Sequence, residues 1–93
     1  MAYDCGVYVI ENGVNGHRYI GSAVSFKKRF REHHRQLSEG RHHSRYLQRA
    51  WDKYGADAFR FKPLLYCDRH NLIGYEQNAM DVMRPEYNIA PVA

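Results

Sequence analysis

The sequence lacks the apolar segments that place a protein in a membrane or direct it to secretion. None of its apolar runs approaches the length of a membrane span. No basic region followed by an apolar stretch marks a secretion signal at the N-terminus. With 93 residues, 44% of them hydrophobic, the chain has room for one modest core. We therefore expect a single globular, soluble domain over residues 1–93.

Cysteine is scarce, and the motifs of common metal and nucleotide sites are missing. Cys5 and Cys67 form no CxxC pair and lie in segments with strand character. We expect buried free thiols in a reducing compartment, because a disulfide would require those two strands to be neighbours. Six histidines include two adjacent pairs, but adjacent histidines on a helix point in different directions, so no structural zinc site is predicted. Glycine-rich phosphate loops and Ser/His/Asp or Cys/His signatures are absent.

Acidic residues are rare in one part of the chain. The net charge is +4, but residues 27–53 hold nine basic and three acidic residues and carry +6, which leaves −2 for the remainder. This asymmetry favours a polyanionic partner such as nucleic acid, although a basic surface that only aids solubility would look the same. The basic residues of this segment are Lys27, Lys28, Arg29, Arg31, Arg35, Arg41, Arg45, Arg49 and Lys53.

Two short strands near the N-terminus are predicted to form a hairpin. Residues 5–11 and 17–21 alternate in the manner of strands, and two Asn-Gly pairs lie between them. With two candidate turns, the register stays undecided. Tyr8 and Tyr19 fall on either side of the turn and are candidate cross-strand neighbours. A strand tyrosine usually packs half-buried; two phenols on one face beside a basic helix would also suit a phosphodiester.

The rest of the chain predicts three helices and a third strand. Helical periodicity covers 25–38, 44–54 and 71–83, and residues 58–67 alternate and then run apolar. Pro63 predicts that this strand lies at an edge or is locally broken, and the tail from residue 86 is expected to be extended. The capping and stop signals of the helices are Ser22 or Ser25, Gly40, Gly55 and Pro85. The residues expected to face the core from the first two helices are Phe26, Phe30, His33, Leu37, Leu47, Ala50, Trp51 and Tyr54.

Charged side chains at apolar helix positions are the candidates for chemistry. Glu76 projects from the predicted buried face of helix 71–83, among Leu72, Ile73, Ala79, Met80 and Met83. A buried carboxylate needs a partner, so it forms a salt bridge to an arginine on a neighbouring helix, or it is a metal ligand or acid–base group. Arg29 and His33 border the apolar stripe of helix 25–38. They form a solvated basic edge, or they clamp a phosphate and move a proton.

Several motifs, taken in order, resemble those of GIY-YIG nucleases. G-V-Y at 6–8 and Y-I-G at 19–21 resemble the two halves of that signature, with Val7 in place of the usual isoleucine. The likeness covers nearly the whole chain and is greatest to the catalytic domain of phage and intron-encoded homing endonucleases. It includes the segments NGHRYIGS (15–22), FKKRFREH (26–33), LQRAWDKYG (47–55), FRFKPLL (59–65), YEQ (75–77) and PEYNI (85–89).

The resemblance implies a fold and a set of site residues. The fold is α+β, with a small three-stranded antiparallel sheet flanked by helices in the order β-β-α-α-β-α, in one nuclease domain over 1–93. The implied catalytic residues are Tyr8, Tyr19, Arg29, His33, His42, Glu76 and Asn88. The implied DNA-binding residues are Lys27, Lys28, Arg31, Arg35, Arg41, Arg45, Arg49 and Lys53.

Each catalytic residue takes an expected role from the resemblance. Glu76 would bind one Mg²⁺ or Mn²⁺ ion per active site. Tyr8 is the first choice as general base and Tyr19 the alternative, although a free phenol has a pKa of about 10 and needs help. Arg29 would stabilise the transition state. His33 would contact phosphate or relay the proton, and Asn88 would orient the site.

The activity implied is metal-dependent DNA hydrolysis, by nicking or double-strand cleavage, that leaves 5′-phosphate and 3′-hydroxyl ends. The enzyme would be of the homing type or a stand-alone phage or bacterial nuclease, in the cytoplasm of a bacterial or phage-infected cell. Double-stranded DNA is the expected partner, and no membrane is. One site cuts one strand, so double-strand cleavage needs a dimer or sequential nicks. The alternatives are an inactive nucleic-acid-binding module and a nuclease for RNA or single strands.

Overall fold

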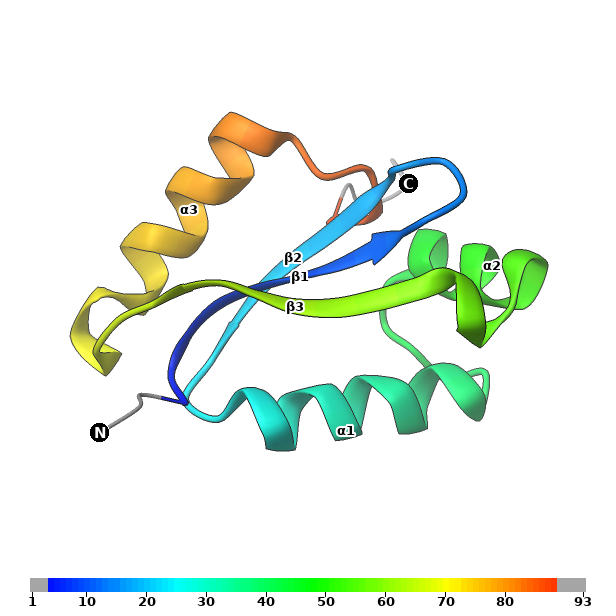
Figure 1. Cartoon of the computed structure of the whole chain (residues 1–93), viewed down its shortest axis with the longest axis horizontal. Helices are drawn as coiled ribbons and strands as arrows, with labels where there is room; N and C mark the ends of the chain where they lie inside the picture. The colour runs from blue at the N-terminus through cyan, green and yellow to red at the C-terminus, as the bar shows by residue number, and fades with distance from the viewer. Residues whose placement is uncertain (1–3, 89–93) are drawn as a thin grey trace.

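The computed structural model describes residues 4–88 and is built around a three-stranded antiparallel sheet (Figure 1). Strand β1 (Gly6–Asn12) is central, between β2 (Arg18–Ala23) and β3 (Phe59–Tyr66). Tyr8 and Ile10 on one face of β1 and Val7 and Val9 on the other belong to two separate hydrophobic clusters. The sheet is therefore buried on both faces, and the side chains alternate between them along β1, which confirms the strand predicted from residues 5–11.

Helices cover both faces of the sheet (Figure 1). Helices α1 (Phe26–Ser38) and α2 (Arg45–Tyr54) build the larger core on the Tyr8 face, and α3 (Leu72–Met83) packs on the other face. The predicted α+β class and element order are confirmed. None of the helices in the described part of the chain has the length and apolar character needed to cross a membrane. Short 3₁₀ turns complete the fold at Ala56–Ala58 (η1), Arg69–Asn71 (η2) and Glu86–Asn88 (η3).

The hairpin register corrects the expected relation of the two tyrosines. Strands β1 and β2 are joined by the loop 13–17; Tyr8 lies opposite Gly21, and Tyr19 lies opposite Ile10. The two phenols are thus diagonal on one face of the sheet, not direct cross-strand neighbours. Gly21 has no side chain, and an added Cβ would lie 2.4 Å from Tyr8 Oη. The glycine therefore leaves the space in which the Tyr8 ring lies across the neighbouring strand.

Strand β3 is an edge strand with a local irregularity, as Pro63 predicted. Its register against β1 shifts between Val7 and Tyr8, so that Tyr8 faces Pro63 while Val7 faces Leu65. Proline has no N–H for a sheet hydrogen bond, and an irregular edge strand tolerates that loss.

The ends of α1 and α2 follow local sequence signals. Of the two candidate N-caps of α1, Ser25 is the one that accepts from Lys28 N, at 3.3 Å. Ser44 caps α2 by accepting from Leu47 N at 3.2 Å. Gly55 ends α2 with φ of 87°, a left-handed value that favours glycine. These signals were readable in sequence because each acts over three or four residues.

Helix α3 departs from the predicted pattern. Its C-terminal half packs through Ala79, Met80 and Met83, but Ile73 is 83% exposed and no α3 side chain is fully buried. The small cluster beneath it, formed by Val7, Val9 and Ile20, is too narrow to cover the first turn as well. The predicted buried face was therefore too broad, and Glu76 is half-buried rather than fully enclosed.

Two smaller expectations also need correction. Glu86–Asn88 form a 3₁₀ turn rather than an extended segment, and the remainder of the predicted tail lies outside the described residues. Cys5 is buried, but Cys67 is only half-buried, and both are free. Their strands are neighbours, since Cys67 N donates to Cys5 O at 3.0 Å.

Candidate active site

A pocket of about 260 Å³ collects side chains from all three layers of the fold. Strands supply the two tyrosines, α1 supplies Arg29 and His33, and α3 supplies Glu76 from the opposite side of the sheet. The pocket is lined by Tyr8, Tyr19, Gly21, Ser22, Arg29, His33, His43 and Glu76. Five of the predicted catalytic residues thus share one cavity, and the other two, His42 and Asn88, do not line it.

Tyr8 and His33 form the buried back of the pocket. The Tyr8 hydroxyl is hydrogen-bonded to His33 Nε2, and the two side chains are 2% and 3% exposed. Burial, reinforced by Tyr19, raises the pKa of Tyr8 above its usual value, while Arg29 acts against that rise. In the free protein Tyr8 is therefore a neutral phenol, and added positive charge in the pocket would favour its ionised form.

His42 supports His33 from outside the pocket. Its Nε2 lies 2.7 Å from His33 Nδ1, and its Nδ1 accepts from Ser44 N at 3.0 Å. Its own backbone N–H donates to Gln48 Oε1 at 3.0 Å, which ties this loop to α2. The buried histidines are thus held by a network between α1 and α2 that no local sequence pattern indicates.

Tyr19 has a partner, His43, that no sequence pattern indicated. His43 Nε2 lies 2.9 Å from Tyr19 Oη, and His43 is exposed at the pocket mouth. Burial, followed by the charge of Glu76, raises the pKa of Tyr19, and Arg29 opposes that rise. His42 and His43 lie in the loop before α2, not on a helix, and their rings stack with centroids 4.4 Å apart. The premise that adjacent histidines diverge on a helix does not apply to them.

Glu76 is hydrogen-bonded to the Ser22 hydroxyl, which holds the carboxylate toward β2. One alternative predicted from the sequence was a salt bridge between Glu76 and an arginine. Among residues 4–88, Glu76 forms no such salt bridge. The same residues contain no group of three or more His, Cys, Asp or Glu side chains that would enclose an ion. A lone carboxylate in an open pocket instead fits Mg²⁺, which commonly takes one or two carboxylates and completes its shell with water and substrate phosphate.

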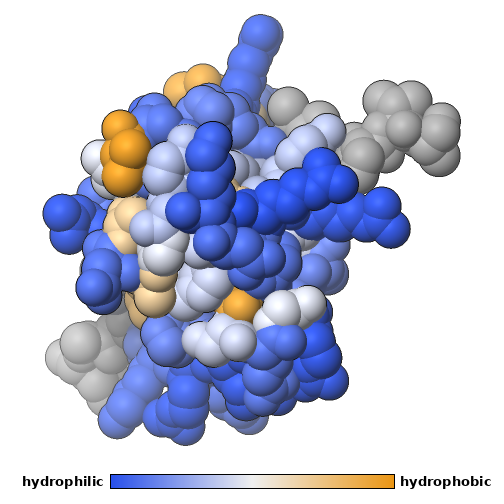
Figure 2. Space-filling view, turned by 90° about the vertical axis from the view of Figure 1, so that its right-hand side faces the viewer, coloured by the Kyte–Doolittle hydropathy of each residue, from blue (hydrophilic) through white to orange (hydrophobic). Residues whose placement is uncertain are grey.

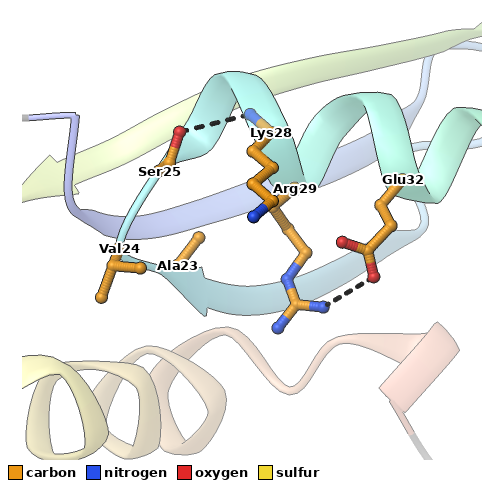
Figure 3. A pocket seen from close by; sticks show the side chains of 6 residues that line it. All are labelled: Ala23, Val24, Ser25, Lys28, Arg29 and Glu32. Atoms are coloured by element: carbon orange, nitrogen blue, oxygen red, sulfur yellow. Dashed lines mark hydrogen bonds and ion pairs between the residues drawn. The ribbon is translucent and has the colours of Figure 1, made fainter.

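Arg29 lies at the junction of two cavities. Besides the pocket of Glu76, it lines a second one of about 210 Å³ beside the start of α1, with Lys28 and Glu32 (Figure 3). Its guanidinium is 3.7 Å from Glu32 and extends away from the α1 axis (Figure 3). The side chain is 46% exposed, so this pair restrains Arg29 only weakly and leaves its donors accessible to an anion.

Asn88 fixes the strand that carries Tyr19. Its side chain accepts from Ile20 N at 2.7 Å and donates to Ile20 O at 2.8 Å. This two-point contact joins the end of the described chain to the edge of β2, where an unpaired strand backbone would otherwise meet solvent. Asn88 therefore supports the site through β2.

The predicted DNA-binding residues all lie exposed on α1, on α2 or in the loop between them. Arg45, Arg49 and Lys53 recur every four residues along one side of α2. The face that carries α2 is dominated by strongly hydrophilic side chains, with only scattered hydrophobic ones (Figure 2). Arg35 and Arg41 both pair with Glu39, at 3.8 and 2.7 Å, so part of the basic charge is offset locally.

Replacing Gly21 by alanine is expected to destabilise the protein by about 1–3 kcal/mol, because the new methyl overlaps Tyr8 Oη and Cζ. Gly74→Ala is the matched control. At Gly74, in the first turn of α3, an added methyl meets no atom within 4 Å, and the substitution should raise the free energy of unfolding by up to about 0.5–1 kcal/mol. Urea denaturation measures both. Equal stability of the two variants would contradict the packing of Tyr8 on Gly21.

The buried histidines are expected to make the protein acid-labile. Burial, with positive charge on neighbouring groups adding to it, lowers the pKa of His33 to about 3 and that of His42 to about 4. An unfolded histidine has a pKa near about 6.5. As the pH falls below about 6.5, the unfolded chain takes up protons that the folded chain does not, which favours unfolding. The two histidines therefore contribute their full stabilisation of the folded state only above about pH 6.5. The free energy of unfolding should fall by about 4 kcal/mol between about pH 7 and pH 5.

Urea titrations at several pH values test that slope. The double variant His33→Gln, His42→Gln should flatten it, and His70→Gln, which removes an exposed imidazole in η2, should keep it. A wild-type stability that is flat over this window would show that the two rings are not held neutral by burial.

Comparison with known proteins agrees with this arrangement. Residues 4–88 match the GIY-YIG catalytic domain. The fold is similar to a solved structure of the catalytic domain of homing endonuclease I-TevI, with a TM-score of 0.84 and 32% sequence identity over 94% of this chain and 99% of that one. A second structure, of a mutant of the same catalytic domain, gives a TM-score of 0.82 and 31% identity over 96% of both chains.

Curated relatives match a shorter segment. The chain is 44% identical over 50 residues to intron-associated endonuclease 1 of Enterobacteria phage T4, and 43% identical over 56 residues to probable intron-encoded endonuclease 1 of Neurospora crassa. These alignments cover 54% and 60% of this chain but only 20% and 17% of those proteins. With a family match over residues 4–88 and a fold that places the signature tyrosines in one pocket, this chain belongs to the GIY-YIG family.

Proposed function

We propose that this protein is a metal-dependent endonuclease that hydrolyses phosphodiester bonds in double-stranded DNA and leaves 5′-phosphate and 3′-hydroxyl ends. The observation that carries the proposal is the convergence of two phenols, one guanidinium and one carboxylate on a single pocket of about 260 Å³. Those groups come from four elements, so their meeting requires the whole fold. Membership of a family of catalytic domains supports a reaction at this pocket rather than binding alone.

Arg29 is the residue suited to the scissile phosphate. Its guanidinium is always charged, it presents several donors, and it lines the pocket with Glu76 and the tyrosines. Charge that develops on the phosphate oxygens in the transition state would be stabilised by these donors. Arg29 therefore acts on phosphate, and its weak pairing with Glu32 leaves it available.

Tyr8 is the proposed general base. The attacking water forms the new bond to phosphorus and gives its proton to the ionised Tyr8 oxygen, while the bond to the 3′ oxygen breaks and that oxygen takes a proton from solvent. Tyr8 is neutral in the free protein, so substrate and cations must enter the pocket before it loses its own proton. Tyr19, held by His43, orients the water or the phosphate and is the alternative base.

Glu76 is the proposed metal ligand, oriented by Ser22. GIY-YIG nucleases generally depend on a metal ion, and a lone carboxylate in the pocket fits Mg²⁺ or Mn²⁺, one ion per site. Such an ion, when bound, would supply positive charge that stabilises the phosphate oxygens and favours ionisation of groups nearby.

DNA is the proposed substrate because the named relatives are intron endonucleases and the pocket adjoins a basic surface. Arg45, Arg49 and Lys53 on α2, with the exposed basic residues of α1, would contact backbone phosphates on either side of the cut. Such contacts position the duplex but read little sequence, so the domain should show weak sequence preference.

A plasmid cleavage assay with Mg²⁺, with Mn²⁺ and with a chelator tests the proposal. Metal-dependent conversion of supercoiled plasmid to nicked or linear product is expected, and DNA ligase should reseal the nicks, since it requires a 5′-phosphate and a 3′-hydroxyl. The ratio of nicked to linear product reports whether two cuts are coupled. Plasmid binding without cleavage under all metals would favour a binding module, and cleavage of RNA or single strands alone would refute the double-stranded substrate.

A further inference from the structure

A backbone amide and three buried rings form a continuous chain of hydrogen bonds behind the pocket. Ser44 N donates to His42 Nδ1 at 3.0 Å, His42 Nε2 lies 2.7 Å from His33 Nδ1, and His33 Nε2 is hydrogen-bonded to Tyr8 Oη. The three rings are 2–6% exposed. Because they are buried, these protein groups rather than bulk water satisfy their ring atoms.

The Ser44 amide sets the direction of every hydrogen bond in this series, because a backbone N–H can only donate. His42 Nδ1 accepts it, so the single proton of a neutral His42 ring is on Nε2 and is donated to His33 Nδ1. His33 Nδ1 is then an acceptor, and the proton of a neutral His33 is on Nε2, facing Tyr8 Oη. The low pKa of both rings, about 3 and about 4, keeps them neutral at physiological pH.

We propose that the Ser44 amide, acting through His42, fixes His33 as a hydrogen-bond donor to Tyr8 and prevents His33 from taking the Tyr8 proton. The inference rests on the proposed function, in which Tyr8 exchanges protons with the attacking water. The reverse tautomers would place a proton on His42 Nδ1 against the Ser44 N–H, leaving two donors facing each other in a part-buried contact. Such a pair is costly, so His33 Nε2 keeps its proton and cannot accept the one on Tyr8.

Two consequences follow for the reaction. The Tyr8 proton leaves through the pocket, on the side of Arg29 and Glu76, rather than through the histidines. The negative charge that remains on Oη is stabilised by the N–H of His33, since hydrogen bonds to charged acceptors are stronger than those to neutral ones. His42 is therefore a positioning residue, because it acts on Tyr8 only through His33.

The tautomers can be read directly from the ¹⁵N chemical shifts of the imidazole nitrogens in the labelled full chain at neutral pH. We expect Nε2 to carry the proton and Nδ1 to be unprotonated in both His33 and His42. A proton on Nδ1 of either ring in the wild-type protein would overturn the proposal. This measurement requires no cleavage, so it separates failure of the inference from failure of the proposed function, which the plasmid assay reports.

Comparing Ser44→Pro with Ser44→Ala separates the effect of the backbone N–H from that of the side chain. Both remove the side chain that caps α2, but only proline removes the N–H, and the φ of −84° at this position is close to the value that proline adopts. Relative to Ser44→Ala, Ser44→Pro should move protons to Nδ1 and lower the single-turnover cleavage rate about 10- to 100-fold, with an unchanged Kd for DNA. Equal rates in the two variants, with the tautomers changed, would overturn the functional link.

A second pair keeps the proposal testable if Ser44→Pro does not fold. His33→Gln retains an N–H donor within reach of Tyr8, whereas His33→Leu does not. Cleavage by the glutamine variant should exceed that of the leucine variant at least about tenfold, at matched Kd for DNA. Equal activities would show that donation to Tyr8 is not the role of His33.

Discussion

Replacing Glu76 by alanine is expected to lower metal-dependent plasmid cleavage by about a thousandfold. A metal ion contributes several kcal/mol to stabilising charge on a transferring phosphate, and about 4 kcal/mol corresponds to that loss in rate. Glu76 is half-buried and its bond to Ser22 is a single contact, so the fold should survive. Single-turnover cleavage rates over a range of Mg²⁺ concentrations measure the effect.

The neighbour of Glu76 supplies a matched control. Gln77 is exposed on the outer side of α3, where it contacts Asp81, and Gln77→Ala should cleave within about twofold of wild type. Thermal denaturation of both variants checks that the fold is intact. If Glu76→Ala cleaves at the wild-type rate with the same Mg²⁺ dependence, the metal is not held by this carboxylate.

Replacing Tyr8 by phenylalanine is expected to lower the cleavage rate about 10²- to 10⁴-fold, the range for loss of a general base. The ring is kept, so its edge contacts with Phe26 and Phe30, at centroid distances of 6.3 and 5.3 Å, should persist. The buried N–H of His33 loses its acceptor, and a stability loss of about 1–3 kcal/mol is expected. Single-turnover rates and urea denaturation measure the two effects separately.

Two other tyrosines provide a control and a test of the alternative base. Tyr66→Phe removes an exposed hydroxyl from β3 and should leave the cleavage rate unchanged. Tyr19→Phe decides between the two candidate bases, because it removes the phenol held by His43 while keeping Tyr8. If Tyr19→Phe loses far more activity than Tyr8→Phe, the assignment of the base reverses.

Local patterns were sufficient for most of the fold. Period-two alternation on β1, helical spacing on α1 and α2, and the caps at Ser25 and Gly55 all depend on residues within a few positions of one another. The prediction was wrong at Ile73, because the width of the apolar face of α3 depends on how much sheet lies beneath it. The area of sheet beneath α3 is determined by the pairing of strands that are far apart in the sequence.

The chemistry of the site was also readable in sequence, through motif identity. The motifs alone indicate the two tyrosines, Arg29, His33 and Glu76, and the fold places all five in one pocket. Their family roles remain proposals that the variants above test. His43 and Ser22 were missed because neither stands out by type or spacing, and each acquires its partner only when α3 and the loop before α2 meet β2.

The sequence by itself therefore determined the element order, the basic segment and the residue types available for chemistry, since those follow from composition and short-range periodicity. Only the tertiary structure decided that Tyr8 lies across Gly21, that Tyr19 is diagonal to it, and that His33 is neutral and aimed at Tyr8. These features depend on strand register and on burial between layers. Hydrogen bonds between residues 25 or more positions apart, such as Tyr8 with His33, form only after the backbone has folded.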